Sequence, residues 1–248
     1  MLSRPELEAV AGLCIRHDAL AVTDEIYEHI RFEGSHVPIA TLPGMRERTV
    51  TISGASKTFS VTGWRVGWIV APPGLTDAIR KVHDFLTVGA PAPLQEGVAV
   101  ALEGLGAEFY AALAAGYRAR RDLLYGALLE AGFRCSRPEG AYYILADFSR
   151  LAGGAGAPEG DDTAFAVWLS REVGVTPVPG SSFFREGGTG GRTLVRFVFC
   201  KTEDILMEAA RRLAALRGRT VGPGTREAGG GSGADGGGDL AARSGLQR

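Results

Sequence analysis

Cysteine is scarce in this sequence of 248 residues, and the three cysteines present are far apart. Cys14, Cys135 and Cys200 form no closely spaced pair of the kind that binds a metal ion, and their odd number argues against a disulfide framework. We therefore predict buried thiols in a protein from a reducing compartment. An excess of one charge is also absent, because the net charge is only −1. This balance does not indicate a nucleic acid or an anionic membrane as a partner.

Long apolar runs are missing as well. No run approaches the ~20 residues that a membrane-spanning helix needs, and the first residues lack the basic-then-apolar pattern of a secretory signal. A cytoplasmic location is therefore expected. Apolar residues still make up 45% of the chain, enough for a sizeable core in one large domain or two small ones. The segment from residue 217 to 248 is rich in glycine and poor in apolar residues, so we expect it to be disordered.

Helical and strand patterns alternate in the first part of the chain. Ser3 to Asp18 has the apolar spacing of a helix, and Ser3 with Glu6 has the pattern of a capping box. Apolar or β-branched runs predict strands at 19–22, 49–52 and 66–71. Near-continuous apolar runs are typical of strands buried on both faces of a parallel sheet. The sequence therefore predicts an α/β layer.

Helices are predicted next at 75–86, 94–105 and 107–131, and Gly132 is suited to end the last of them. This last helix carries a charged cluster that we expect to form a solvent-exposed face, comprising Arg118, Arg120, Arg121 and Asp122.

A second layer follows residue 133. Strands are predicted at 141–146 and 193–200, with a helix at 162–173 and an extended stretch at 175–180 between them. Residues 151–160 are loop-like, and Thr202 is expected to cap a final helix.

The most distinctive stretch surrounds Lys57, which sits in a turn of small residues between two predicted strands. A partly desolvated ammonium loses its proton more readily, and the free amine is a nucleophile for carbonyl groups. Arg65 follows shortly after and provides a permanent cation. An amine and a cation together suit an aldehyde that carries a phosphate. A buried lysine paired with a carboxylate is an open alternative.

Other polar residues follow or interrupt predicted strands. Asp24 comes at the end of the first strand, where functional residues gather in α/β sheets, but it also fits a loop carboxylate or helix cap. Tyr27 follows closely and also fits a core aromatic residue. Arg196 lies inside an apolar strand, where burial is costly unless the charge is paired. An edge-strand arginine that reaches solvent is the alternative.

The segment from Gly54 to Gly67 reads as small, apolar, small, lysine, and then Gly-x-Arg-apolar-Gly. It resembles the pyridoxal-phosphate attachment signature of class I aminotransferases. The flanking segments 42–45 and 58–64 are most similar to the kynurenine, glutamine and methionine transaminase branch. The resemblance runs from about residue 3 to about residue 216.

The resemblance implies a fold and a domain division. Residues 1–75 would form the second half of a fold type I large α/β domain that binds pyridoxal phosphate, and 76–118 a helical connection. Residues 119–216 would form the small α+β C-terminal domain, followed by the tail at 217–248. Relatives begin well upstream, so an N-terminal truncation is expected. The missing half would carry a phosphate loop, an aromatic residue that stacks on the cofactor, and an asparagine.

The resemblance also implies roles for residues. Lys57 would hold pyridoxal 5′-phosphate as a Schiff base and move a substrate proton. Asp24 would pair with the pyridine nitrogen, and Tyr27 would hydrogen-bond the phenolic oxygen. Arg65 would bind the phosphate, with Ser56 beside it.

Arg196 would clamp the substrate α-carboxylate, because a planar guanidinium binds a carboxylate through two parallel hydrogen bonds. One departure from the signature concerns the phosphate site. Gly54 stands where some relatives carry a phosphate-binding serine.

The implied reaction is amino-group transfer between an L-amino acid and a 2-oxo acid, in a homodimer if the protein is full-length. The amino acid would be aromatic, sulfur-containing or glutamine. The aromatic pairs at 142–143 and 183–184 suggest the first two classes, and a core role explains them equally well. A cysteine-conjugate β-lyase and a catalytically incompetent C-terminal fragment are the alternatives. About three strands would leave the sheet's edge and apolar faces exposed, so we expect poor solubility or a need for a second chain.

Overall fold

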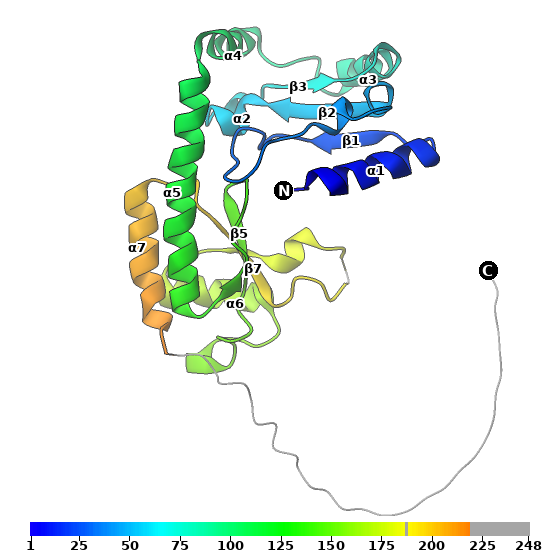
Figure 1. Ribbon diagram of the computed structural model, residues 1–248. Helices are drawn as coiled ribbons and strands as arrows, with labels where there is room; N and C mark the ends of the chain where they lie inside the picture. The colour runs from blue at the N-terminus through cyan, green and yellow to red at the C-terminus, as the bar shows by residue number, and fades with distance from the viewer. Residues whose placement is uncertain (187, 219–248) are drawn as a thin grey trace, which may run out of the picture.

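The computed structural model describes residues 1–186 and 188–218. Two β-sheets lie at opposite ends of the molecule, and the long helix α5 (Ala107–Ala131) runs beside both of them (Figure 1). The predicted disorder of the tail concerns residues 217–248, of which all but the first two lie outside the described part.

The first sheet contains three strands in the order β1 (Ala21–Asp24), β2 (Thr49–Gly54) and β3 (Gly67–Val70). Strands β1 and β2 are parallel, and β2 and β3 are antiparallel. The predicted number of strands and the α/β layer are confirmed. The sheet is preceded by α1 (Arg4–Arg16), whose capping box between Ser3 and Glu6 is present as predicted.

Burial of the first sheet differs from the prediction. The side chains of Val22 in β1 and Val70 in β3 are 66% and 64% exposed, so the prediction of strands buried on both faces is wrong for them. Strand β2 is mostly buried. Val22 and Val70 lie on opposite faces of the sheet, because Thr51 is the partner of both Thr23 and Val70. The predicted exposure of apolar sheet surface is confirmed.

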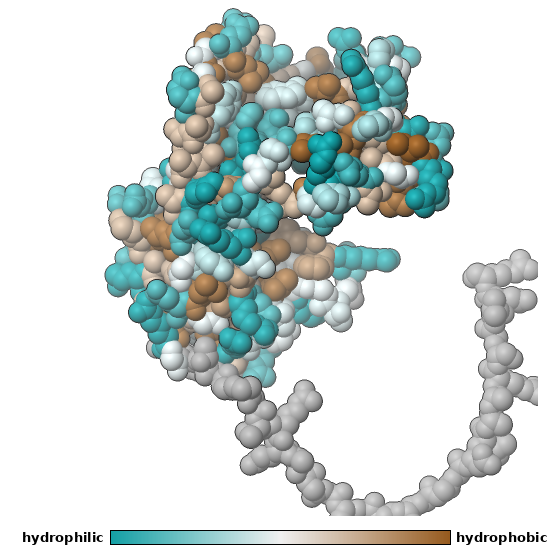
Figure 2. All heavy atoms as spheres, in the orientation of Figure 1, coloured by the Kyte–Doolittle hydropathy of each residue, from teal (hydrophilic) through white to brown (hydrophobic). Residues whose placement is uncertain are grey.

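The predicted helices are present as α3 (Pro73–Leu86), α4 (Ala92–Gly104) and α5. Gly132 ends α5 in the left-handed conformation, with φ 102°, which explains a glycine there. Figure 2 shows hydrophobic surface over α4, where Val100 and Leu102 are exposed. Within the described ranges no single helix is long and apolar enough to cross a membrane. Helices α4 and α5 together pass by length and composition, but they are bent by 99°.

The second sheet has four antiparallel strands in the order β4-β5-β7-β6. Their bounds are Arg134–Cys135 (β4), Tyr143–Asp147 (β5), Leu194–Val198 (β7) and Val178–Pro179 (β6). The predicted strands are confirmed with shifts of one to two residues at their ends.

Two helices complete this half: α6 (Asp162–Trp168), continued by a π-helical stretch at Leu169–Val173, and α7 (Glu203–Leu213). Thr202 precedes α7 as predicted, but its side chain makes no capping hydrogen bond. Short helical elements are Ala55–Thr58 (α2) and 3-10 turns at Ile39–Thr41, Arg46–Arg48, Thr62–Trp64, Gly154–Gly156, Gly180–Phe183 and Ala214–Leu216.

The largest core lies on the second sheet. It contains Phe148 and Phe165, whose rings stack at 3.9 Å, and it also contains Ile30 and Phe32, which follow the first strand in sequence. Chain segments far apart in sequence therefore share one core across the predicted domain boundary at residue 75.

Two expectations about individual side chains are wrong. Arg121 is fully buried, at 0% exposure, although its charged cluster was expected to face solvent. The three cysteines are free and half-buried rather than buried. Burial raises the pKa of the Cys135 thiol to about 11, so this thiol is a weak nucleophile.

Candidate active site

Lys57 lies in α2, directly after the carboxyl end of β2. Its side chain is half-buried, and Nζ is 5.5 Å from the centroid of the Tyr142 ring. Among the described residues, no carboxylate forms an ion pair with Lys57 within 4.0 Å. The alternative of a buried, paired lysine is therefore not what this structure shows.

Glycines of the signature bring β2 and β3 close together. A Cβ at Gly67 would lie 2.8 Å from the Ser53 carbonyl oxygen, and one at Gly54 would lie 3.0 Å from the Gly67 Cα. Contacts this short leave no room for a side chain at either position. The two glycines thus fix the turn that carries Lys57 against the start of β3.

Arg65 stands just before β3 in the left-handed conformation, with φ 57°. Its Nη1 donates to the Thr62 carbonyl oxygen at 3.1 Å, and the side chain is exposed. It lines an open cavity of about 850 Å³ together with Arg80 and His83. Lys57 lies at the same edge of the sheet and does not line this cavity.

Asp24 ends β1 and is exposed. Its Oδ1 accepts a hydrogen bond from the Ile26 amide at 3.2 Å, which agrees locally with the loop-carboxylate alternative. Strands β1 and β2 run parallel with Asp24 opposite Ile52, so Asp24 and the Lys57 turn share the carboxyl edge of the sheet. Asp24 lines a second cavity, of about 450 Å³, with Tyr27 and Tyr143.

Three tyrosines connect the two sheets at this edge. The Tyr27 ring meets Tyr142 edge-on at 5.1 Å and Tyr143 at 6.0 Å. Burial, reinforced by the neighbouring Tyr142 hydroxyl, raises the pKa of Tyr27 far above its usual value, while Arg196 acts weakly in the other direction. Tyr27 therefore stays protonated and can donate a hydrogen bond. The sequence identified Tyr142 only as part of an aromatic pair and missed its contact with Lys57.

Arg196 belongs to β7, which lies between β5 and β6, so the edge-strand alternative is wrong. Its guanidinium is 4.1 Å from the Phe183 ring centroid and 5.3 Å from that of Tyr143. Its Nε is buried and has no hydrogen-bond partner within the described part of the chain. An unsatisfied buried donor costs about 1–3 kcal/mol. Binding of an anion would remove that cost.

Three of the predicted site residues are joined by aromatic contacts. Lys57, Tyr27 and Arg196 are linked through Tyr142 and Tyr143. Asp24 and Arg65 line separate cavities on the same sheet edge, as described above.

Ser56 precedes Lys57 in α2 and is half-buried. Its carbonyl oxygen accepts from the Thr62 hydroxyl at 3.1 Å, which ties α2 to the turn before Arg65.

The sequence analysis did not identify the polar pair formed by Glu25 and His36. His36 Nε2 is 2.6 Å from Glu25 Oε2, and Thr23 also donates to Glu25. Although burial acts in the opposite direction, the hydrogen bonds from His36 and Thr23 lower the pKa of Glu25. The hydrogen bond between Glu25 and His36 also raises the pKa of His36. The adjacency of Glu25 to Asp24 was the only available signal.

The family model described as "Aminotransferase class I and II" matches residues 1–213. The chain belongs to the class I and II aminotransferases. It is 39% identical over 227 residues to a probable N-succinyldiaminopimelate aminotransferase of Mycobacterium tuberculosis, covering 88% of this chain and 55% of that protein. It is 36% identical over 232 residues to a kynurenine–oxoglutarate transaminase of Dictyostelium discoideum, covering 87% and 53%. The resemblance stated from the signature is thereby confirmed.

Solved aminotransferase structures show the same arrangement. The N-succinyldiaminopimelate aminotransferase from Mycobacterium tuberculosis superposes with a TM-score of 0.79 at 40% identity, over 87% of this chain and 54% of that one. A methionine aminotransferase from Escherichia coli superposes with a TM-score of 0.78 at 35% identity, over 87% and 54%. This aminotransferase chain thus spans about half the length of the relatives that it matches.

Aminotransferases of this family depend on pyridoxal phosphate. The residues present fit that group in chemical type: Lys57 is an amine without a described ion pair, and Tyr27 is a donor held protonated. The Nε of Arg196 is a buried donor without a partner among the described residues.

Proposed function

We propose that this chain provides the lysine and the substrate-carboxylate site of an aminotransferase that moves an amino group between an L-amino acid and a 2-oxo acid. The supporting observation is the continuous contact from Lys57 through Tyr142 and Tyr143 to Arg196. An amine and a carboxylate-binding guanidinium on opposite sides of one aromatic cluster suit a substrate that carries both an α-amino and an α-carboxylate group.

Pyridoxal phosphate, when bound, supplies an aldehyde and an electron sink. The Lys57 amine would attach that aldehyde and, once the substrate has released it, would carry a proton from the substrate Cα to the former aldehyde carbon. Asp24 would pair with the pyridine nitrogen and keep it protonated. Tyr27 would donate to the phenolic oxygen, which its raised pKa permits. Arg65, with Ser56, would hold the phosphate.

Arg196 binds the substrate α-carboxylate through two parallel N–H groups. The rings of Phe183 and Tyr143 flank its guanidinium and fix its plane, so the carboxylate approaches in one orientation. The names of the relatives point to kynurenine, methionine or N-succinyldiaminopimelate as amino donors. The proposed donor is an aromatic or sulfur-containing amino acid or glutamine, and the rings beside Arg196 favour the first two classes.

Further features of the assembly belong to the same proposal. We propose that residues 1–75 form part of a large domain, residues 76–118 a helical connection and residues 119–216 a small domain. We also propose that the complete protein is a homodimer and that it is located in the cytoplasm.

Borohydride trapping tests the attachment residue. The chain has three lysines, Lys57, Lys81 and Lys201, so the competition is small. Incubation with pyridoxal phosphate, reduction and peptide mass analysis should place the reduced adduct on Lys57. The cofactor absorbance band should disappear in Lys57→Ala and remain in Lys81→Ala, a substitution of an exposed lysine. Equal labelling of all three lysines, or an unchanged band in Lys57→Ala, would contradict the proposal.

A further inference from the structure

A short antiparallel contact joins the segment after Tyr27 to the segment before Tyr142. The Phe32 amide donates to the Glu139 carbonyl at 2.7 Å, and the Ala141 amide donates to the Ile30 carbonyl at 2.9 Å. We call residues 30–32 and 139–141 the clasp. Tyr27 follows β1 of the first sheet and Tyr142 directly precedes β5 of the second, and the clasp joins the backbone segments that carry them.

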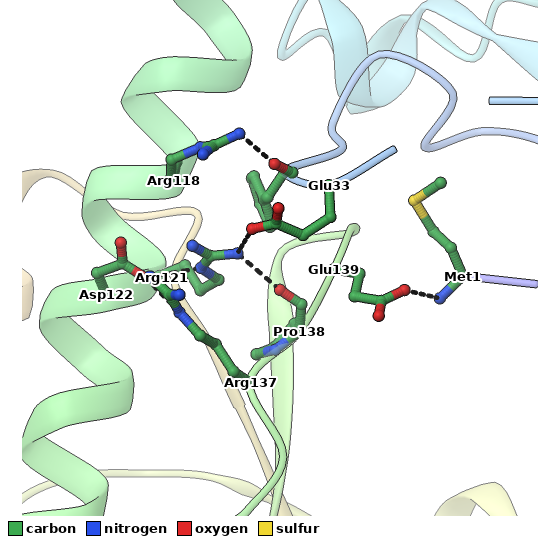
Figure 3. Close-up of polar contacts among 9 residues, drawn as sticks. Met1, Glu33, Arg118, Arg121, Asp122, Arg137, Pro138 and Glu139 are labelled. Carbon is green, nitrogen blue, oxygen red and sulfur yellow. Dashed lines mark hydrogen bonds and ion pairs between the residues drawn. The ribbon is translucent and has the colours of Figure 1, made fainter. Parts of the chain in front are cut away.

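Arg121 contacts Glu33, directly after residues 30–32 of the clasp, and Pro138, directly before residues 139–141 (Figure 3). Its guanidinium carbon is 4.6 Å from the centroid of the Phe32 ring. Its Nη1 donates to the Pro138 carbonyl oxygen at 2.9 Å and is 3.8 Å from Glu33 Oε1. One side chain of α5 therefore reaches the segment that leaves the first sheet and the segment that enters the second.

The helix holds this side chain in place. Arg121 Nε donates to Asp122 Oδ1 at 2.8 Å, and the same carboxylate oxygen accepts from Arg137 Nη2 at 2.8 Å. Arg118, one turn earlier, donates to the Phe32 carbonyl oxygen. Contacts with Asp122 therefore fix the Arg121 side chain on the α5 side, independently of its contacts near the clasp.

A buried cation needs a physical reason. Arg121 is 0% exposed, and its Nη2 has no hydrogen-bond partner among the described residues. The desolvation of a buried charge can cost more than its ion pairs return, so a leucine would fill a helix position in a core more cheaply. What leucine lacks is a donor for the Pro138 carbonyl and a charge for the Phe32 ring. The contacts with the Phe32 ring and with the Pro138 carbonyl, next to the clasp, account for an arginine there.

We propose that Arg121 is a positioning residue, which fixes the clasp and thereby sets Tyr27 against Tyr142 at the meeting of the two sheets. The first step of this proposal, that Arg121 places Tyr27 against Tyr142, concerns geometry alone. The second step, that this placement aligns Lys57 with Arg196 for amino transfer, rests on the proposed function.

A tyrosine titration tests the first step without any cofactor. Tyr27 ionises only far above the usual range, because it is buried against its neighbours. In Arg121→Met, Tyr27 should loosen, so one additional tyrosine should ionise at an ordinary pH while the far-ultraviolet circular dichroism stays native. This additional ionisation should be absent in Arg121→Met/Tyr27→Phe. Arg211→Met, which removes an exposed arginine paired with Glu208, should titrate like the parent.

Arg121→Lys guards against a variant that does not fold. It keeps the charge but lacks the planar group over Phe32, so it should show the same additional ionisation to a smaller extent. An unchanged titration in both folded variants would overturn the proposal, since a merely structural arginine lowers stability without releasing Tyr27.

Kinetics test the second step on protein that shows cofactor trapping at Lys57. Arg121→Met should lower kcat/KM by about ten- to a hundred-fold through misplacement of the reacting groups, and Arg121→Lys should recover part of it. If trapping fails in the parent, the proposed function fails and the tyrosine result still decides the positioning role. If trapping succeeds and kcat/KM is unchanged in Arg121→Met, the second step is wrong.

Discussion

The two sheets of this chain differ in how completely their apolar side chains are buried. The second sheet is covered by α5 and α6, with α7 packed against α5, and it buries residues such as Ile144 and Val195 almost completely. The first sheet leaves Val22 and Val70 largely in solvent. The second sheet therefore carries its own core, whereas the first has apolar faces that no described element covers. The proposed active site lies where the two meet.

Removal of one buried ring should give the largest effect on stability. Phe165 is fully buried and stacks on Phe148, so Phe165→Ala should lower the free energy of unfolding by about 3–5 kcal/mol. Phe85 is 94% exposed, so Phe85→Ala should change it by less than about 0.5 kcal/mol. Denaturant unfolding measures both. Equal losses in the two variants would erase the difference between the sheets.

The pair of Glu25 and His36 beside the first sheet should give an intermediate, pH-dependent effect. The lowered pKa of Glu25 means that its contribution is complete above its ordinary value of 4.5 and is lost as the pH falls through its folded value. The raised pKa of His36 means that its contribution is complete below 6.5 and is lost as the pH rises through its folded value. The pair should therefore stabilise most between these two limits.

In that window His36→Gln should lower the stability by about 1–2 kcal/mol, because a charged hydrogen bond is lost. The difference from the parent should shrink on both sides of the window. His17→Gln, at an exposed position, provides the matched control. A difference that stays constant with pH would show that the pair is not ionised in the folded protein.

The exposed strands should give the smallest effect on stability. Val22→Thr and Val70→Thr should each change the free energy of unfolding by less than about 0.5 kcal/mol, yet reduce binding of a hydrophobic dye and aggregation during size-exclusion chromatography. Val195→Thr, the same change at a buried strand position, should be strongly destabilising. A large loss in Val22→Thr would mean that this face is covered in solution.

Local structure could be predicted from the sequence, whereas the difference in burial between the two sheets could not. The capping box at Ser3 and the helix ending at Gly132 follow from local spacing, and both are confirmed. The turn around Lys57 could be identified because its glycines are required by contacts between neighbouring strands. Each of these signals lies within one segment of the chain.

Burial could not be predicted in the same way. Arg121 lies in a charged run that is typical of a solvent-exposed face, and it is buried by Phe32 and Pro138, which are remote in sequence. Val22 lies in an apolar run that is typical of a buried strand, and it is exposed because no described layer lies over it. The contact of Tyr142 with Lys57 is likewise a product of the tertiary structure.

The long helix α5 has a mechanical consequence. Its 25 residues form one uninterrupted rod of about 37 Å that extends from the first sheet to β4. A rod of this kind transmits rotation from one end to the other, so the gap between the sheets cannot widen by bending in its middle. A change in the distance between the sheets would therefore have to occur at an end of the helix, and Leu105 and Gly106 form the link to α4 at the first of these ends.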